Sequence, residues 1–339
     1  MEGAYYNGQY LNRLERLGYS QAEIDNKLES TFEEMFYGPE GVRLCHCAGP
    51  DMMYIEDTGN HDVRTEGMSY AMMFCVQMNR QKEFDCLWRW VVTHMYLTEG
   101  ENAGYFAWSC HTDGSKNSDG PAPDGEEFFA MSLFFAANRW GSGEGVLDYA
   151  SWARRILHAC VHKGEEAGSG FPMWNPENHL IKFIPNCEFT DPSYHLPHFY
   201  ELFALWSDEC DRPFWHAAAA ASRQYLRKAC HARTGLSAEY AEYDGRPHRG
   251  DQPDRHDWFF SDAYRTLGNI ALDAQWFGDK DGWAQETAAH IQQFFEEKEH
   301  GQTNGIYLID GTPVEGNALH PVGLLATIAQ GSLILDDAC

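Results

Sequence analysis

Residues 57–78 read DTGNHDVRTEGMSYAMMFCVQM and join a polar, turn-rich lead-in to an apolar run with helical spacing. The run is apolar on nearly every face, which predicts a helix that is buried on all sides. Glu66 stands where this helix begins. Burial disfavours the charged form of a carboxyl group and raises its pKa, so such a group can serve as a proton donor. The alternative is an ordinary acidic residue that complements the helix dipole.

The composition of the chain narrows its function. The chain has 339 residues and a formal net charge of -26 at pH 7. This charge argues against binding to nucleic acid or to an anionic membrane, because both partners require basic patches. Aromatic residues make up 14% of the chain, which favours stacking on flat ligands or sugar rings, or else a large aromatic core.

Targeting signals are missing from the sequence as given. The first residues contain no apolar segment typical of a signal peptide, and no apolar run approaches the length of a membrane span. The composition shows no linker or clear boundary. We therefore expect a cytoplasmic protein whose residues 1–339 form a single domain.

The ten cysteines are scattered along the chain. Most lie within apolar helical patterns, as Cys75, Cys86, Cys160 and Cys230 do, and we interpret them as reduced core thiols. The segment Cys45–Cys47 encloses a histidine and hints at a metal site, but no second cluster with ligand spacing follows. The sequence therefore predicts neither a metal site nor a cofactor.

Helical periodicity covers most of the chain. The predicted helices are residues 20–36, 66–79, 82–96, 124–140, 147–162, 192–206, 213–230, 259–277, 282–297 and 322–334. Some are apolar all round, such as 128–137, and others are amphipathic, such as 147–162 and 282–297. This alternation favours an all-α fold in which an inner ring of helices is wrapped by an outer ring. A plain helical bundle or a solenoid is the alternative, although the sequence has no repeat of fixed period.

Two further acids share the context of Glu66, a loop followed by an apolar helix. They are Asp124 in PAPDGEEFFAMSLFF and Asp262 in DWFFSDAYRTLGNIAL. If the inner helices begin at one face, the three carboxyl groups converge there, as glycoside hydrolysis requires. Asp124 has an alternative interpretation as a helix N-cap. Asp262 has one as a structural ion pair with Arg265, three residues further along the helix.

Aromatic residues gather in the loops near these acids. Trp108 precedes the Asp124 loop, Trp174 lies in the loop over residues 163–176, and Tyr194 follows Asp191. Each is more often a core residue than a ligand platform, but their clustering in Gly- and Pro-rich loops favours a binding role.

Longer motifs carry a family resemblance. They are TEGMSYAMMFCVQM, AGYFAWSC, GPAPDGEEFFA, NHLIKFIP, FTDPSYHLPHFYELF, FFSDAYR and LHPVGLLAT. Together they resemble glycoside hydrolase family 8, and more narrowly its reducing-end xylose-releasing exo-oligoxylanases. The resemblance runs from about residue 4 to about residue 333. It implies an (α/α)6 barrel, an inverting mechanism and a β-1,4-xylo-oligosaccharide substrate.

The resemblance also implies roles for individual residues. Glu66 matches the general acid, Asp262 the general base, and Asp124 the acid that binds and distorts the sugar at the point of cleavage. Arg265 matches the arginine after the base, and Tyr194 the tyrosine near the attacking water.

A loop in the same family closes the cleft in the exo-acting members. Leu319, His320 and Pro321 match that loop, and His320 matches the residue that recognises the reducing-end xylose. A closed end admits only a terminal residue past the cut, because longer products are rejected by steric clash.

One departure concerns the end of the chain. The barrel has twelve helices and the sequence shows about ten, because relatives continue past GSL with a further helical pair. We therefore expect a chain that is truncated at its C-terminus and lacks that pair.

Two alternative functions stay open from the sequence. One is an endo-acting hydrolase of the same family, cutting xylan, β-glucan or chitosan, and the other is a non-catalytic sugar-binding barrel. The oligomeric state is not predicted.

Overall fold

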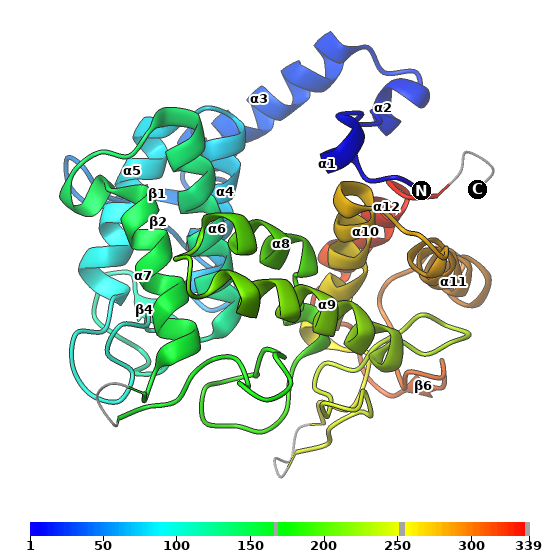
Figure 1. Cartoon of the computed structure of the whole chain (residues 1–339). Helices are drawn as coiled ribbons and strands as arrows, with labels where there is room; N and C mark the ends of the chain where they lie inside the picture. Colours follow the sequence, from blue (N-terminus) through cyan, green and yellow to red (C-terminus); the bar gives the residue numbers. More distant parts are fainter. Residues whose placement is uncertain (166–168, 251–254, 336–339) are drawn as a thin grey trace.

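The computed structural model describes residues 1–165, 169–250 and 255–335. Helices dominate, and short strands pair at their edges (Figure 1). The helices are α1 (Ala4–Asn7), α2 (Arg13–Arg16), α3 (Gln21–Tyr37), α4 (Thr65–Gln77), α5 (Gln81–Trp90), α6 (Pro123–Trp140), α7 (Tyr149–His162), α8 (Pro197–Trp206), α9 (Arg212–Ala229), α10 (Arg265–Phe277), α11 (Trp283–Glu299) and α12 (Pro321–Gly331). Shorter helical turns are η1 (Val91–Met95), η2 (Gly145–Leu147), η3 (Pro192–Tyr194) and η4 (Ser261–Tyr264).

Three antiparallel strand pairs complete the described structure. β1 (Cys45–Cys47) pairs with β2 (Met53–Ile55), β3 (Asp62–Arg64) with β4 (Ser109–His111), and β5 (Ile306–Tyr307) with β6 (Pro313–Val314). These pairs are only two or three residues long. They act as anchors for the chain next to helix ends rather than as a sheet.

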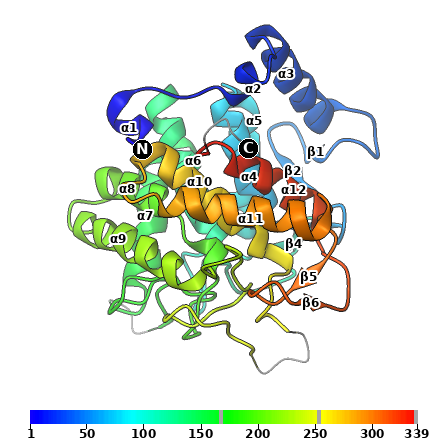
Figure 2. The same cartoon turned by 90° about the vertical axis from the view of Figure 1, so that its right-hand side faces the viewer.

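The helices form consecutive hairpins around an inner arc. α4 packs on α5, α6 on α7, α8 on α9 and α10 on α11. The first member of each hairpin also contacts the next, so that α4, α6, α8, α10 and α12 follow one another side by side. Figure 1 shows this order, and Figure 2 shows α11 crossing the outside of α10 and α12.

The sequence explains which helices lie inside. α4 and α6 carry apolar or small residues around most of their circumference and bury most of them. α7 and α9 are amphipathic and bury one face against the arc. Burial on all sides suits an all-apolar helix, whereas an amphipathic helix keeps its polar face in water. The predicted, mostly helical class is confirmed.

Each predicted helix is present, with two instructive differences. The span 192–206 is split into η3 and α8, because Pro197 lacks a backbone N–H and restricts the residue before it. The span 259–277 begins later, because Phe259 bonds to the backbone of Tyr307 as an extended residue, at 2.7 Å from N to O. The prediction missed the short helices α1 and α2, which are too brief to show periodicity.

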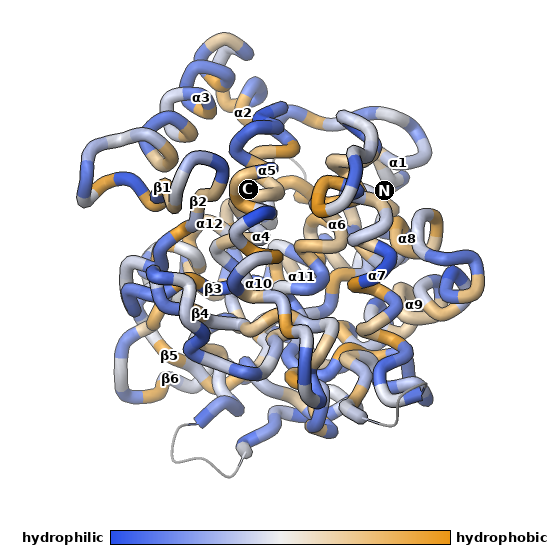
Figure 3. The backbone as a smooth tube through the Cα atoms, turned by 90° about the vertical axis from the view of Figure 1, so that its left-hand side faces the viewer, coloured by the Kyte–Doolittle hydropathy of each residue, from blue (hydrophilic) through white to orange (hydrophobic). Residues whose placement is uncertain are grey.

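One large aromatic cluster fills the space between the first hairpins. Its fully buried members include Trp88, Trp174 and Trp215. Helix α3 projects from this body, and Figure 3 shows it largely hydrophilic. Phe32 and Phe36 are its buried residues, and their rings stack 4.1 Å apart.

The thiols and the apolar helices agree with the sequence analysis. All nine cysteines in the described ranges are free, and Cys75, Cys86, Cys160 and Cys230 are buried. In the part of the chain that the structure describes, no helix has both the length and the apolar character needed to cross a membrane.

Candidate active site

The start of α4 is anchored by the strand pair of β3 and β4. β3 pairs with β4 directly before the helix, and the Thr65 amide donates to the Trp108 carbonyl at 3.0 Å. Glu66 is therefore the second residue of a helix whose first turn cannot move freely. The N-terminal position also favours a negative charge through the helix dipole.

The start of α6 is packed against the start of α4. Pro123 opens α6, where its missing N–H costs nothing. Gly125 follows Asp124, and a Cβ atom at that glycine would lie 2.4 Å from the Thr65 Cβ. Only glycine permits this approach, so the contact brings Asp124 and Glu66 to one place from positions far apart in sequence.

Asp262 reaches the same place from the turn η4. The preceding Ser261 has a φ of 45°, a left-handed conformation that is uncommon for a residue with a side chain. The turn leads directly into α10, whose first residue is Arg265. The Asp262 side chain remains 34% exposed, while that of Asp124 is 3% exposed.

Arg265 links the acids to one another. Its Nη1 donates to Asp124 Oδ2 at 2.8 Å and to the Tyr70 hydroxyl at 2.9 Å. Its Nη2 lies 3.1 Å from Asp262 Oδ2. The three sequence-predicted acids and the predicted arginine are thus brought together by α4, α6, η4 and α10.

The electrostatics differ between the acids. Burial, and next the charge of Asp124, raise the pKa of Glu66, and Arg265 opposes the shift. Burial also raises the pKa of Asp124, but in that case the first opposing effects are the charge and the hydrogen bond of Arg265. The pKa of Glu66 is raised to about 8, which favours its protonated form near neutral pH, whereas Arg265 partly offsets the rise at Asp124.

Tyr194 closes one side of the cluster. It is 5% exposed, and the Arg265 guanidinium lies over its ring at 5.5 Å. The Tyr200 hydroxyl oxygen lies 3.2 Å from the Tyr194 carbonyl oxygen, and Asn269 Nδ2 donates to the Ser193 carbonyl at 2.7 Å. These bonds hold η3 against α8 and α10, so the Tyr194 ring has a fixed position.

The predicted loop Leu319–Pro321 lies beside Asp262. His320 Nε2 is 3.9 Å from Asp262 Oδ1, and its ring packs edge-on against Tyr264 at 5.9 Å. Leu319 is 58% exposed. Thr303 donates its hydroxyl to the Pro321 carbonyl at 2.9 Å, which anchors the loop where α12 begins.

The two tryptophans predicted to bind substrate have different positions. Trp108 is half-buried and lies under the Arg64 guanidinium at 5.2 Å, next to the start of α4. Trp174 is 1% exposed and packs edge-on against Trp215 at 4.9 Å and Tyr200 at 5.7 Å. The prediction that Trp174 binds substrate is wrong, because its loop folds inward and completes the aromatic core.

The sequence analysis missed two residues that support the acids. Tyr70 lies one turn after Glu66 and accepts the Arg265 hydrogen bond; its helical spacing from Glu66 was a usable signal. Glu239 is 5% exposed, contacts His256 Nδ1 at 2.8 Å and accepts a hydrogen bond from Ser261. Burial, and next the charge of Asp262, raise the pKa of Glu239 to about 8. It lies in a loop without periodicity, so nothing in the sequence marked it.

An apolar cavity of about 510 Å³ adjoins the cluster between the inner helices. Its lining includes Asp124 and Arg265 together with Phe128, Phe199 and Trp276, but neither Glu66 nor Asp262. The apolar wall on this side explains why Asp124 is so well desolvated. The cavity therefore lies behind the acid cluster, and it is not the place where a substrate would meet Glu66 and Asp262.

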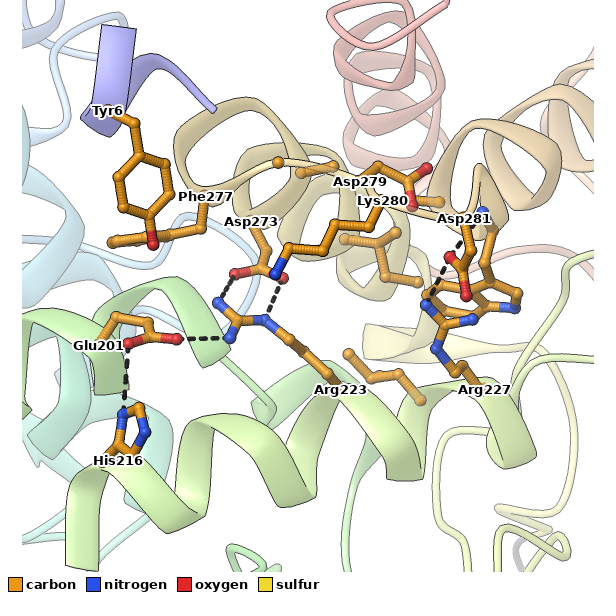
Figure 4. Close-up of a pocket in the computed structure, with 16 residues that line it drawn as sticks. Tyr6, Glu201, His216, Arg223, Arg227, Asp273, Phe277, Asp279, Lys280 and Asp281 are labelled. Carbon is orange, nitrogen blue, oxygen red and sulfur yellow. Dashed lines mark hydrogen bonds and ion pairs between the residues drawn. The ribbon is translucent and has the colours of Figure 1, made fainter. Parts of the chain in front are cut away.

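A second hollow of about 520 Å³ lies between α8, α9 and α10 (Figure 4). Two of its arginines are paired with acids: Arg223 donates to Asp273 at 2.7 and 2.8 Å and also contacts Glu201. Arg227 donates to Asp281 at 2.9 Å. These pairs join helices and leave the acid cluster as the better candidate for chemistry.

Comparison with known proteins agrees with this choice. The sequence pattern described as glycosyl hydrolases family 8 matches residues 19–330. A reducing end xylose-releasing exo-oligoxylanase of Halalkalibacterium halodurans is 55% identical over 333 residues, which cover 98% of this chain and 84% of the relative.

Solved structures of a second relative superpose closely. Rex8A from Paenibacillus barcinonensis complexed with xylose is 54% identical, with a TM-score of 0.96 over 99% of this chain and 89% of the other. A mutant of Rex8A complexed with an arabinofuranosyl-xylotetraose also gives a TM-score of 0.96 and 54% identity, over 100% of this chain and 88% of the other.

Proposed function

Because the chain belongs to the glycosyl hydrolases of family 8, we propose that it releases xylose from the reducing end of β-1,4-xylo-oligosaccharides. The observation that carries the proposal is the arrangement around Arg265. This residue contacts two carboxylates, Asp124 and Asp262, while Glu66 beside them has a raised pKa. A carboxyl group with a raised pKa beside an exposed carboxylate can serve as the proton donor.

Glu66 is the general acid in this account. Its proton passes to the glycosidic oxygen as the bond from that oxygen to the anomeric carbon breaks. Charge developing on the leaving group is thereby neutralised, a contribution of about 10²–10⁴ in rate for general acids.

Asp262 is the general base. The Arg265 guanidinium lies 3.1 Å from the Asp262 carboxylate, and the 34% exposure of Asp262 gives water access to it. Water attacks the anomeric carbon from the face opposite the leaving group and gives its proton to Asp262. Direct displacement inverts the anomeric configuration and requires about 6.5–9.5 Å between the two carboxyl groups.

Asp124 and Tyr194 position the sugar and the water. Asp124 is held by Arg265 and by the Gly125 amide, which donates to its Oδ1 at 3.0 Å. A carboxylate fixed in this way can hold a sugar hydroxyl in the distorted geometry of the transition state. Tyr194, packed on the same guanidinium, lies where it can orient the attacking water. Trp108 contributes an apolar face for a sugar ring.

The exo action is assigned to the loop of Leu319, His320 and Pro321. His320 lies beside Asp262, so the loop stands next to the point of attack. A wall there leaves room for one xylose on the reducing side, and His320 can recognise its hydroxyl groups. Longer leaving groups are rejected by clash.

The closed barrel fold and the cellular location are also part of the proposal. We infer that the hairpins belong to an (α/α)6 barrel, which the side-by-side order of the five inner helices supports. We also propose a cytoplasmic enzyme acting on imported oligosaccharides. The free thiols of the described residues support this setting, and cell fractionation tests it.

The test is the product ladder from xylohexaose. Removal of one residue at a time yields xylose and the pentamer first, whereas an endo-acting relative yields internal fragments such as trimers. If nothing is cleaved, oligosaccharide binding by Glu66→Gln and by the unmodified chain is compared. Equal binding without cleavage by either protein would favour a sugar-binding barrel.

A further inference from the structure

Two histidines and one aspartate meet outside the acid cluster. His158 and His162 lie four residues apart on α7, so both project from one face of the helix, and their rings are 4.6 Å apart. Asp211, which precedes α9, faces them from another hairpin and is 2% exposed. Among the described residues, these three are the one group of His, Cys, Asp or Glu whose ligand atoms all lie within 4.8 Å of one another.

Each carboxylate oxygen of Asp211 faces one of the two histidine rings. Its Oδ1 lies 2.8 Å from His162 Nε2, and its Oδ2 lies 3.8 Å from His158 Nδ1. Ligand bonds of about 2.0 Å in a tetrahedral site place neighbouring ligand atoms about 3.3 Å apart. The two carboxylate–imidazole separations lie on either side of that value, and the three ligand atoms all lie within 4.8 Å of one another.

The second nitrogen of His162 is already oriented. His162 Nδ1 lies 2.8 Å from Glu165 Oε2. Histidines that bind metal usually direct their other ring N–H to a carboxylate, which fixes the tautomer and raises the basicity of the ligand nitrogen. Glu165 thus takes the position of an outer-sphere partner.

The cluster is open on one side. The His158 and His162 side chains are 45% and 26% exposed, whereas Asp211 is buried. An ion can therefore enter from solvent, and a water molecule can complete the coordination. An anionic carboxylate below two imidazoles is a donor set suited to Zn²⁺ and to neighbouring divalent ions such as Co²⁺ and Ni²⁺, rather than to Mg²⁺ or Ca²⁺.

We propose that His158, His162 and Asp211 form a binding site for a divalent ion of the zinc class, with water as the fourth ligand. The bound ion joins α7 to the start of α9 and so clasps two consecutive hairpins. An ion that binds only the folded chain raises its stability by mass action. The site is separate from the acids of the proposed hydrolase, so it adds a property that the catalytic account does not require.

The experiment is calorimetric titration of the EDTA-treated 339-residue chain with ZnCl₂. We expect one saturable site and a higher melting temperature with zinc. His158→Ala should weaken binding by more than about tenfold. This variant is chosen because His158 is partly exposed, so its loss should leave the circular dichroism spectrum unchanged.

Two further variants separate this site from others. His61→Ala is the matched control, because His61 is an exposed histidine with a carboxylate 2.9 Å away, and it should bind zinc as the parent does. Glu66→Gln should also bind normally, which excludes the acid cluster as the site. Absence of saturable binding by the parent, or unchanged affinity in His158→Ala, would overturn the proposal.

Discussion

At the scale of single residues, Arg265 and Glu66 have different roles: Arg265 pairs with the neighbouring acids, and Glu66 is the proton donor that we propose. The Arg265 side chain is only 12% exposed, and it reaches acids on α6 and η4 and the hydroxyl of Tyr70 on α4. A buried cation needs such partners, because an unpaired charge in the interior is costly. Glu66 is left beside these pairs with a raised pKa, and the result is an acid and a base within one cluster.

Replacement of Asp124 by asparagine tests this coupling. The negative charge of Asp124 raises the pKa of Glu66, so Asp124→Asn should lower that pKa. The protonated acid is the active form, and activity falls as pH rises through its pKa. The alkaline limb of kcat/KM on xylotriose should therefore move to lower pH in the variant.

The matched control is Asp113→Asn, which removes a charge from an exposed loop and should leave the limb in place. The full pH profile of kcat/KM is measured for both variants. If the alkaline limb of Asp124→Asn stays at the pH of the parent, Asp124 does not raise the pKa of Glu66.

Many residues of the proposed site could be predicted from sequence patterns. Glu66, Asp124 and Asp262 could be predicted because each stands where a loop meets an apolar helix. Glu239 could not, because its burial depends on a contact between two irregular loops. Trp174 was assigned wrongly, since a Trp in a Gly-rich loop looks the same in sequence whether the loop folds outward or inward.

At the scale of elements, Trp174 belongs to the packing of its loop against α8 and α9. Trp174→Ala should lower the free energy of unfolding by about 3–5 kcal/mol, the usual cost of removing a large buried aromatic side chain. KM for xylotriose should change little at temperatures where the variant is folded. Urea denaturation and steady-state kinetics measure the two quantities.

Trp108→Ala provides the contrast, because Trp108 is half-buried beside the acid cluster. It should raise KM more than it lowers stability. If Trp174→Ala instead raised KM without a loss of stability, the assignment of Trp174 to the core would be wrong.

The loop before α12 decides the product in this account. The double variant Leu319→Ala, His320→Ser should open space beside Asp262 and admit a second xylose on the reducing side. Xylotetraose labelled at its reducing end should then release labelled xylobiose as well as labelled xylose. The measurement is chromatography of early products.

The matched control for that loop is Val322→Ala, which shortens an exposed apolar side chain two residues after His320. It should release only xylose. Release of xylose alone by the double variant would show that the loop does not limit the leaving group.

The helices could be predicted better than their connections. Apolar periodicity over ten or more residues marks a helix strongly, and each predicted span is present. The strand pairs of two or three residues carry no such pattern. The cluster of His158, His162 and Asp211 was missed for a related reason: the i, i+4 histidines are visible in sequence, but Asp211 reaches them only through the packing of two hairpins.

At the scale of the whole molecule, buried acids link stability to pH. Glu126, Glu127, Asp191 and Glu239 are each 5% exposed or less, and burial raises the pKa of each. A folded state with raised carboxyl pKa values binds more protons than the unfolded state. Stability from these groups is complete below the unfolded pKa and is lost as pH rises toward the folded pKa.

Glu127→Gln should flatten this dependence. Glu127 accepts a hydrogen bond from the Tyr200 hydroxyl, which the glutamine oxygen can also accept. The fall in unfolding free energy as pH rises above the ordinary carboxyl pKa should be smaller in the variant than in the parent. Exposed Glu40→Gln is the control and should keep the parent slope, as urea denaturation at several pH values would measure. A Glu127→Gln variant with the parent slope would contradict the account.

The central claim is inverting release of xylose from the reducing end by Glu66 and Asp262. The most direct test is a timed digest of xylotriose labelled at its reducing end, with the anomer of the new end followed by proton NMR. We predict that labelled xylose leaves first, that the new reducing end appears as the α-anomer, and that Glu66→Gln abolishes both signals. Unlabelled xylose as the first product, or a β-anomer at the new end, would contradict the claim.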